Sequence, residues 1–174
     1  MRRIHAADIA ENIKKLMLTA SCELRPDVRR ALKNALASER SQRGRRILSI
    51  ILENAAIAKK QKIPICQDTG IACVFCEIGN TVCISNGSWE AAIQSGIKQA
   101  TKQGYLRRSI VKSPIKRVNT NTNAPGIVHY KFTSGDRVKL KILLKGFGSE
   151  NKSAIALMNP TASQSELIDF IVST

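Results

Sequence analysis

The sequence Ile63-Pro-Ile-Cys-Gln-Asp-Thr-Gly70 marks the point at which the chain changes its hydrophobic period. Upstream of it, apolar residues recur at the three- and four-residue spacing of helices, and downstream they form short β-prone runs. Pro64 disfavours a helical conformation at Ile63, and Gly70 frees the chain to turn on the other side. The stretch therefore predicts an extended segment leading into a tight loop, and loops on a rigid scaffold often carry function.

Four consecutive side chains in this loop, Cys66 to Thr69, carry a thiol, an amide, a carboxylate and a hydroxyl. An ionised Cys66 can ligate a metal or a cluster, and Gln67 and Asp68 can orient a small polar substrate. A polar turn beside a buried cysteine is an equally good interpretation from chemistry alone, because free cysteine is among the most buried residue types.

The part of the chain before the loop predicts three helices. Asp8 and Glu11 form a capping-box-like start for the first helix, Pro26 suits the first position of the second, and the third runs from about Ser41 to Lys60. Each helix has an apolar stripe that we expect to lie in the core. The stripes are Ile9, Ile13, Leu16, Met17 and Ala20; Val28, Ala31, Leu32, Ala35 and Leu36; and Ile47, Leu48, Ile51, Leu52 and Ala55.

The part after the loop predicts four strands and two further helices. We expect a hairpin across Gly79-Asn80, a helix capped by Ser88, two strands joined by a short polar turn, and a last helix. The expected strands are Ile71–Ile78, Thr81–Ser85, Ile127–Phe132 and Val138–Leu144, and the helices are Trp89–Gln103 and one from about Ser165. The pattern predicts one α+β domain over residues 1–174, with N-terminal helices followed by a mixed, largely antiparallel sheet with packed helices.

Charge and cysteine content limit the function classes. The chain has 28 Lys and Arg against 13 Asp and Glu, a net charge of +15, which raises the hypothesis of a basic nucleic-acid-binding module. Few aromatic residues accompany the charge, so platforms for base stacking are scarce. Five cysteines is an odd number, and no apolar signal-peptide core or membrane-spanning run is seen. We therefore expect a cytoplasmic protein with free thiols.

A metal site is one interpretation of the cysteines at positions 66, 73, 76 and 83. Cys73-Val-Phe-Cys76 has the C-x2-C spacing of zinc ribbons. However, both residues lie in an apolar strand-like run, and an odd separation along a strand puts them on opposite faces. We expect Cys73 and Cys76 to be core residues.

Four motifs occur in an order and at spacings that resemble a known family. They are Cys66-Gln-Asp-Thr-Gly70, Tyr105-Leu-Arg-Arg-Ser109, Asn119-Thr-Asn-Thr-Asn-Ala-Pro125 and Lys145-Gly-Phe-Gly-Ser-Glu-Asn-Lys152. Together they resemble the α region of the iron–sulfur-dependent hydro-lyases, which comprise class I fumarate hydratase and L(+)-tartrate dehydratase. The resemblance extends over nearly the whole chain.

The resemblance implies a cofactor, a substrate and a set of site residues. A 4Fe-4S cluster held by three cysteines would act as a Lewis acid on a hydroxy-dicarboxylate, interconverting malate and fumarate or tartrate and oxaloacetate. Cys66 matches the first cluster ligand. Gln67 and Asp68 match positions that line the substrate pocket, with Asp68 in the catalytic role. Arg107 matches an arginine that holds a substrate carboxylate, and Gly148 matches backbone close to the substrate.

The same resemblance implies that parts of the enzyme lie outside this sequence. The α region of the family continues further and contains the other two cluster cysteines, and a β subunit or C-terminal domain supplies the proton-abstracting residue. We therefore expect one cluster ligand of three, no activity from this chain alone, and a homo- or hetero-oligomer that does not bind membranes. The alternative, a nucleic-acid-binding module, would show DNA affinity that falls steeply with salt and does not need the Cys66 loop.

Overall fold

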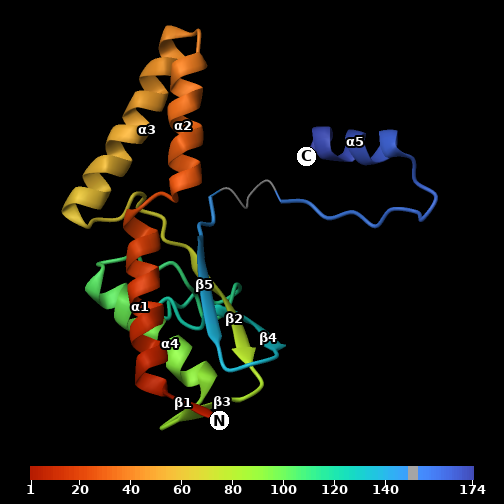
Figure 1. Ribbon diagram of the computed structural model, residues 1–174. Coiled ribbons are helices and arrows are strands. Elements are labelled where there is room, and N and C mark those ends of the chain that lie inside the picture. The colour runs from red at the N-terminus through yellow and green to blue at the C-terminus, as the bar shows by residue number, and fades with distance from the viewer. Residues whose placement is uncertain (149–152) are drawn as a thin grey trace.

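The computed structural model describes residues 1–148 and 153–174 (Figure 1). Its elements are β1 (Arg2–His5), α1 (Ala6–Cys22), α2 (Pro26–Ser38), α3 (Gln42–Gln61), β2 (Ile71–Gly79), β3 (Val82–Ser85), α4 (Trp89–Gln103), β4 (Ile127–Thr133), β5 (Val138–Lys145) and α5 (Gln164–Ser173). Helices and a mixed sheet share one unit, so the α+β prediction is confirmed. None of the described helices is both long and apolar enough to cross a membrane.

The main sheet has three strands in the order β4-β2-β5. The central strand β2 runs parallel to β4 and antiparallel to β5. In this register Phe75 of β2 lies between His129 and Lys141, and the Phe75 and His129 rings stack with their centroids 5.0 Å apart. One parallel and one antiparallel pair make the sheet mixed, as predicted. The pairing is not largely antiparallel, however, because β1 and β3 also pair in parallel.

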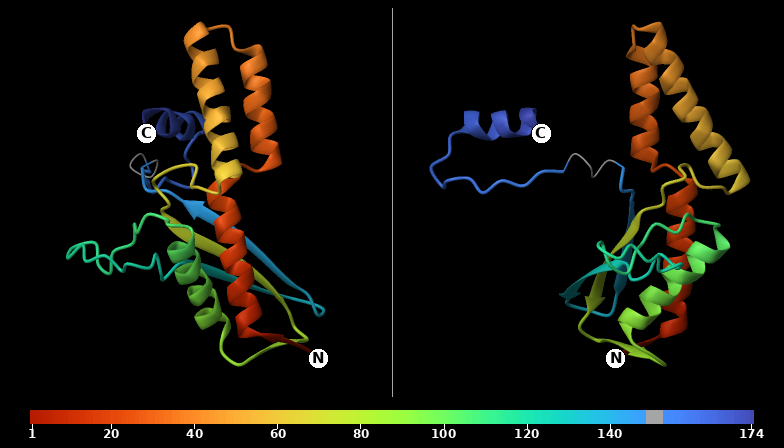
Figure 2. Two further views of the ribbon diagram at one scale, coloured as in Figure 1. Left: turned by 90° about the vertical axis from the view of Figure 1, so that its left-hand side faces the viewer. Right: turned by 180° about the vertical axis from the view of Figure 1, so that it is seen from behind.

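Helices α1 and α4 cover one face of this sheet (Figures 1 and 2). The alternate residues of β2 that point to this face are fully or almost fully buried: Ala72, Val74, Cys76 and Ile78. They meet Ile13 of α1 and Ile93 and Ile97 of α4, all with no exposed surface. Fully burying one such isoleucine stabilises the fold by about 1.5–3 kcal/mol, so this layer is the core that holds the loops in place.

The predicted hairpin between β2 and residues 81–85 is wrong. Both edges of β2 are occupied by β4 and β5, so β3 pairs elsewhere, in parallel with β1, and Ile4 lies beside Ile84. The sequence analysis missed β1, because a four-residue strand containing Arg2 and Arg3 has no apolar alternation to reveal it.

The strands β4 and β5 are joined by a short turn, as expected, but they are not neighbours. The connection passes over the end of β2, where the Gly79 N–H donates to Arg137 O at 2.8 Å and the Asn80 N–H donates to Thr133 O at 2.8 Å. The turn residues thus satisfy the end of the central strand, and β2 lies between the two strands that they connect.

Helices α2 and α3 form a helical arm that projects from the rest of the molecule (Figures 1 and 2). Ser41 caps α3 by accepting the Gly44 N–H at 3.3 Å. The prediction that both apolar stripes lie in the core is wrong for this arm: no residue of α2 is buried, and in α3 Ala58 alone is buried. The two helices pack against each other, and Ile47 and Ile50 of α3 remain about half exposed.

The helices begin where their sequence signals predict, with one exception. Ser88 caps α4 by accepting the Ala91 N–H at 3.2 Å, and Ser163 and Glu166 form a capping box at α5. The exception is α1, which begins at Ala6 after His5, so Asp8 lies inside the first turn rather than at the cap. An acidic residue there still favours the helix through its dipole.

Candidate active site

The loop with Cys66 is fixed at its start by backbone contacts to two helices. Helix α3 ends at Gln61, and the capping residue Lys62 adopts a left-handed conformation with φ 54°. The side chain of Asn54 then donates to Ile65 O at 2.9 Å, and the Ile65 N–H donates to Ser21 O at 2.9 Å. These bonds hold the chain extended up to Cys66, whose exposed thiol accepts the Asp68 N–H at 3.5 Å.

The end of the loop requires a glycine. Gly70 has φ +69°, and a Cβ atom on it would lie 1.8 Å from the carbonyl oxygen of Lys145. No side chain fits at that distance, so Gly70 allows the loop to pass directly beside the end of β5. This close approach brings the first motif against the last one, across 75 positions of sequence.

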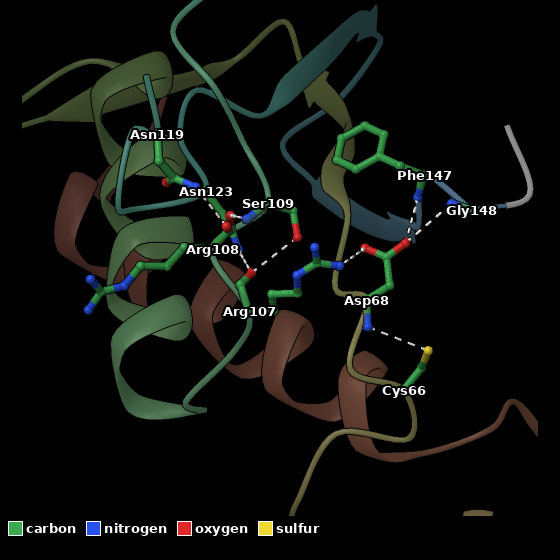
Figure 3. A network of polar contacts seen from close by, with 9 residues as sticks. All are labelled: Cys66, Asp68, Arg107, Arg108, Ser109, Asn119, Asn123, Phe147 and Gly148. Atoms are coloured by element: carbon green, nitrogen blue, oxygen red, sulfur yellow. Dashed lines mark hydrogen bonds and ion pairs between the residues drawn. The ribbon is translucent and has the colours of Figure 1, made fainter. Parts of the chain in front are cut away.

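The carboxylate of Asp68 joins three of the four motifs (Figure 3). Its Oδ2 accepts the main-chain N–H of Phe147 at 2.9 Å and that of Gly148 at 3.3 Å. Its Oδ1 is buried, has no hydrogen-bond partner among the described residues, and lies 3.8 Å from Nη1 of Arg107. One oxygen is therefore anchored to the glycine loop, and the other is left to face the arginine.

The arginine side chain is accessible to a ligand. The side chain of Arg107 is 61% exposed and that of Asp68 is 21% exposed, and an ion pair of 3.8 Å at such exposure contributes little to stability. Gln67 is exposed beside Asp68, and a Cβ on Gly148 would meet no atom of the described residues within 4 Å. The structure thus brings Cys66, Gln67, Asp68, Arg107 and Gly148 together, whereas positions 149–152 of the fourth motif lie outside the described residues.

The Asn119–Pro125 motif packs against the backbone of residues 107–109. The sequence analysis gave this motif no role of its own. The side chain of Asn123 is fully buried and bonds to the backbone of Arg107 and Ser109, and Asn119 bonds to Arg108 O at 2.8 Å. The sequence signal for this role was the tendency of asparagine to bind backbone groups in turns. The backbone groups that these asparagines bind lie more than ten residues away, so the sequence could not identify them.

The other cysteines do not add to this site. Cys73 and Cys76 are buried on opposite faces of β2, so the prediction that they are core residues is confirmed. Burial raises the pKa of the Cys76 thiol to about 11, which disfavours the thiolate that a metal needs. Among the residues that the structure describes, no group of three or more His, Cys, Asp or Glu side chains is placed to hold a metal ion. The described residues at this site therefore offer one exposed thiol, Cys66, and do not by themselves form a metal site.

The site is shallow. A hollow of about 140 Å³ is lined by Cys66, Asp68 and Leu144, among other residues. A larger groove of about 500 Å³ lies between α1 and β5, near Arg2 and Arg3. We place the candidate site beside the smaller hollow, because Cys66 and Asp68 line it and Arg107 pairs with Asp68.

Comparison with known proteins identifies the family of the chain. Residues 10–174 match the fumarate hydratase (Fumerase) family. The chain is 31% identical over 172 residues to a putative L(+)-tartrate dehydratase subunit alpha of Methanocaldococcus jannaschii, covering 95% of this chain and 60% of that protein. It is 32% identical over 159 residues to the aerobic class I fumarate hydratase of Escherichia coli, covering 86% of this chain and 29% of that protein.

A similar match extends to a eukaryote. Fumarate hydratase 2 of Leishmania major is 32% identical over 139 residues, covering 76% of this chain and 24% of that protein. The chain thus spans about 60% of the tartrate dehydratase subunit and less than a third of these fumarate hydratases. With a family match over nearly all of its length, the chain belongs to the fumarate hydratase (Fumerase) family of lyases.

Proposed function

We propose that this chain is the N-terminal part of the α region of a 4Fe-4S hydro-lyase that interconverts a hydroxy-dicarboxylate and its dehydrated product. Malate with fumarate, and tartrate with oxaloacetate, are the two substrate pairs that the named relatives suggest. The observation that carries the proposal is the convergence of Asp68, Arg107 and the Phe147–Gly148 backbone from three distant motifs.

Arg107 is assigned to bind a carboxylate of the substrate. Its guanidinium is largely exposed and forms one long contact to Asp68, so it is available for a bidentate pair with an incoming carboxylate. None of the described residues would lie within 4 Å of a Cβ on Gly148, which supports a ligand beside the loop backbone there, and Gln67, next to Asp68 in the chain, is exposed.

Asp68 is assigned the catalytic role. Two main-chain N–H groups fix its Oδ2, which sets the orientation of the carboxylate before substrate arrives. Its Oδ1, which has no hydrogen-bond partner among the described residues, faces the arginine, where it can accept a hydrogen bond from the substrate hydroxyl and orient that group. A carboxylate that is anchored through its other oxygen suits this task, because it needs little reorganisation when the substrate binds.

Cys66 is assigned as one cluster ligand. A bound cluster supplies a Lewis acid that polarises the substrate. A cuboidal cluster of this kind takes several thiolates, and the described residues offer one exposed thiol at the site. We propose that the other thiolates come from a further part of the α region and that a β subunit or C-terminal domain completes the site, so this chain alone is inactive.

The test of this proposal is substrate binding in the assembled enzyme. Arg107→Ala should raise the KM for L-malate or L-tartrate by roughly 10- to 100-fold, because a carboxylate loses its charged partner. Arg108→Ala is the matched control, since it removes the same charge from the next position and should leave KM within about twofold of the unaltered enzyme. Equal effects of the two substitutions would contradict the assignment of Arg107.

Nucleic-acid binding is a second candidate, favoured by the helical arm. Residues 25–46 carry eight Arg or Lys against two acidic residues, on helices that project into solvent (Figure 2). Replacing Arg43, Arg45 and Arg46 with Gln should then weaken duplex DNA binding and reduce its salt dependence. Replacing Lys131, Lys139 and Lys141 with Gln removes the same charge from the sheet and should have little effect. Absence of DNA binding at low salt would eliminate this candidate.

A further inference from the structure

We propose that Asn123 is a positioning residue for Arg107: its buried side-chain amide fixes the backbone from which the guanidinium reaches Asp68. The inference rests on the proposed function, because it takes Arg107 to be the group that binds the substrate carboxylate. Figure 3 shows two of the three asparagines of the motif, Asn119 and Asn123, on the side of Arg107 away from Asp68. Nothing in the sequence pattern distinguishes Asn123 from Asn119 and Asn121, so the assignment comes from the contacts.

The backbone around Arg107 has no regular secondary structure to fix it. Helix α4 ends at Gln103, and residues 105–110 belong to no helix or strand. Two apolar side chains flank the arginine and are buried, Leu106 at 4% exposure and Ile110 at 8%. They place the segment on the core, but they do not determine how the intervening peptide groups are rotated, and that rotation decides where the Arg107 side chain points.

Asn123 constrains two of these peptide groups, in addition to the bond from Asn119 to Arg108 O. Its Nδ2 donates to Arg107 O at 2.7 Å, and its Oδ1 accepts the Ser109 N–H at 2.7 Å. The side chain is fully buried, so both ends of the amide are paired and neither bond competes with water. One planar group thus fixes the carbonyl of residue 107 and the N–H of residue 109 at the same time.

The position of Asn123 is itself fixed by its surroundings, so its side chain can fix the backbone of Arg107. Its backbone has φ 54°, a left-handed conformation that asparagine tolerates better than most residues. Just after it, Gly126 exchanges two hydrogen bonds with the side chain of Gln94 on α4, at 2.8 and 3.1 Å. The clamp on Arg107 is therefore anchored to a helix of the core.

Three substitutions separate positioning from folding. Asn123→Gly keeps the left-handed backbone possible but removes the amide, and Asn123→Asp keeps an acceptor for the Ser109 N–H but removes the donor to Arg107 O. Asn121→Gly is the matched control, because Asn121 lies in the same loop with φ 61° and is exposed. The control makes the same chemical change and the same increase in chain freedom without removing the clamp.

The test is an NMR measurement on the full chain, reading the Nε–Hε resonance of Arg107. We expect Asn123→Gly and Asn123→Asp to move this resonance in the direction that Asp68→Asn moves it, because each separates the guanidinium from the carboxylate. Asn121→Gly should leave the resonance in place. A general loss of stability, followed separately by thermal unfolding, would not reproduce this signature.

A second readout links the clamp to substrate. In the assembled enzyme Asn123→Gly should raise the KM for L-malate on the order of tenfold with kcat changed much less, since a misplaced cation weakens binding before chemistry. An unshifted Arg107 resonance in both Asn123 variants would overturn the inference. A shifted resonance together with a KM that neither Arg107→Ala nor Asn123→Gly alters would instead contradict the proposed role of Arg107, while leaving the clamp intact.

Discussion

The carboxylate of Asp68 accepts a hydrogen bond from the main-chain N–H of Phe147, 2.9 Å away and 79 positions later in the sequence. The same oxygen accepts the neighbouring N–H of Gly148 at 3.3 Å. This contact closes the glycine loop after β5 onto the loop before β2, and it is the step that turns two separate motifs into one site.

The Asp68 contact should contribute to stability as well as to function. Asp68→Ala leaves two main-chain N–H groups without their acceptor, so we expect the free energy of unfolding to fall by about 1–3 kcal/mol. Asp68→Asn should cost less, because the amide oxygen can still accept one of the two bonds. Urea denaturation followed by circular dichroism measures both, with exposed Glu53→Ala as the control that should change little. An Asp68→Ala variant as stable as that control would refute the contact.

The close approach at Gly70 gives a second stability prediction. Gly70→Ala places a Cβ 1.8 Å from Lys145 O at a positive φ, and we expect a loss of roughly 2–4 kcal/mol from the combined backbone strain and clash. Gly148→Ala, where the added atom meets nothing within 4 Å, should leave the midpoint of thermal unfolding nearly unchanged. Similar midpoints for the two variants would show that the loops do not approach as described.

Much of the helical structure was predictable, because its signals are local. The apolar period of α1 and α4, Pro26 at the start of α2 and the Ser88 cap each act within one or two turns. The pairing of β3 was not predictable, because it depends on β4 and β5 having taken both edges of β2, and these strands come about 50 residues later in the chain. Periodicity likewise shows that α3 has an apolar face, but it cannot say whether anything covers Ile47 or Ile50.

For the candidate site, the sequence motifs predicted which residues take part but not how those residues contact one another. The resemblance named Cys66, Asp68, Arg107 and Gly148, and the structure brings them together. It could not show that Asp68 is anchored through one oxygen, nor that Asn123 clamps the backbone of Arg107. Both facts depend on hydrogen bonds between segments that are far apart in sequence, and no local pattern encodes them.

Thiol reactivity should distinguish the exposed Cys66 from the buried Cys73 and Cys76. Cys66 is exposed, whereas Cys73 and Cys76 are buried in β2. We expect iodoacetamide at pH 8 to alkylate Cys66 in the native chain and to leave Cys73 and Cys76 unmodified until the protein is unfolded in urea, because the thiolate must reach the reagent. Mass spectrometry of the digested protein measures each site. Rapid labelling of Cys76 in the native state would contradict its place in the core.

The Cys76 thiol should also make stability depend on alkaline pH. Burial raises its pKa in the folded chain to about 11, above an unfolded value of about 8.5, so folding favours the protonated form. This contribution is complete below about pH 8.5 and is lost as the pH rises towards 11. Cys76→Ala should therefore lose less stability between pH 8.5 and 11 than the unaltered chain, in urea titrations at fixed pH. An unchanged slope would show that another group dominates, such as Tyr130, whose pKa is raised by partial desolvation and by its hydrogen bond to Glu90.

The measurement that tests the central proposal most directly is cluster content after anaerobic reconstitution of this chain with the rest of the α region and the β part. The unaltered assembly should show the visible absorbance of a 4Fe-4S cluster and hydrate fumarate or dehydrate L-tartrate. Cys66→Ser should lose both the absorbance and the turnover, because one of the cluster's thiolate ligands is gone, whereas Cys83→Ser should keep both. A Cys66→Ser assembly with full cluster content and full turnover would contradict the account.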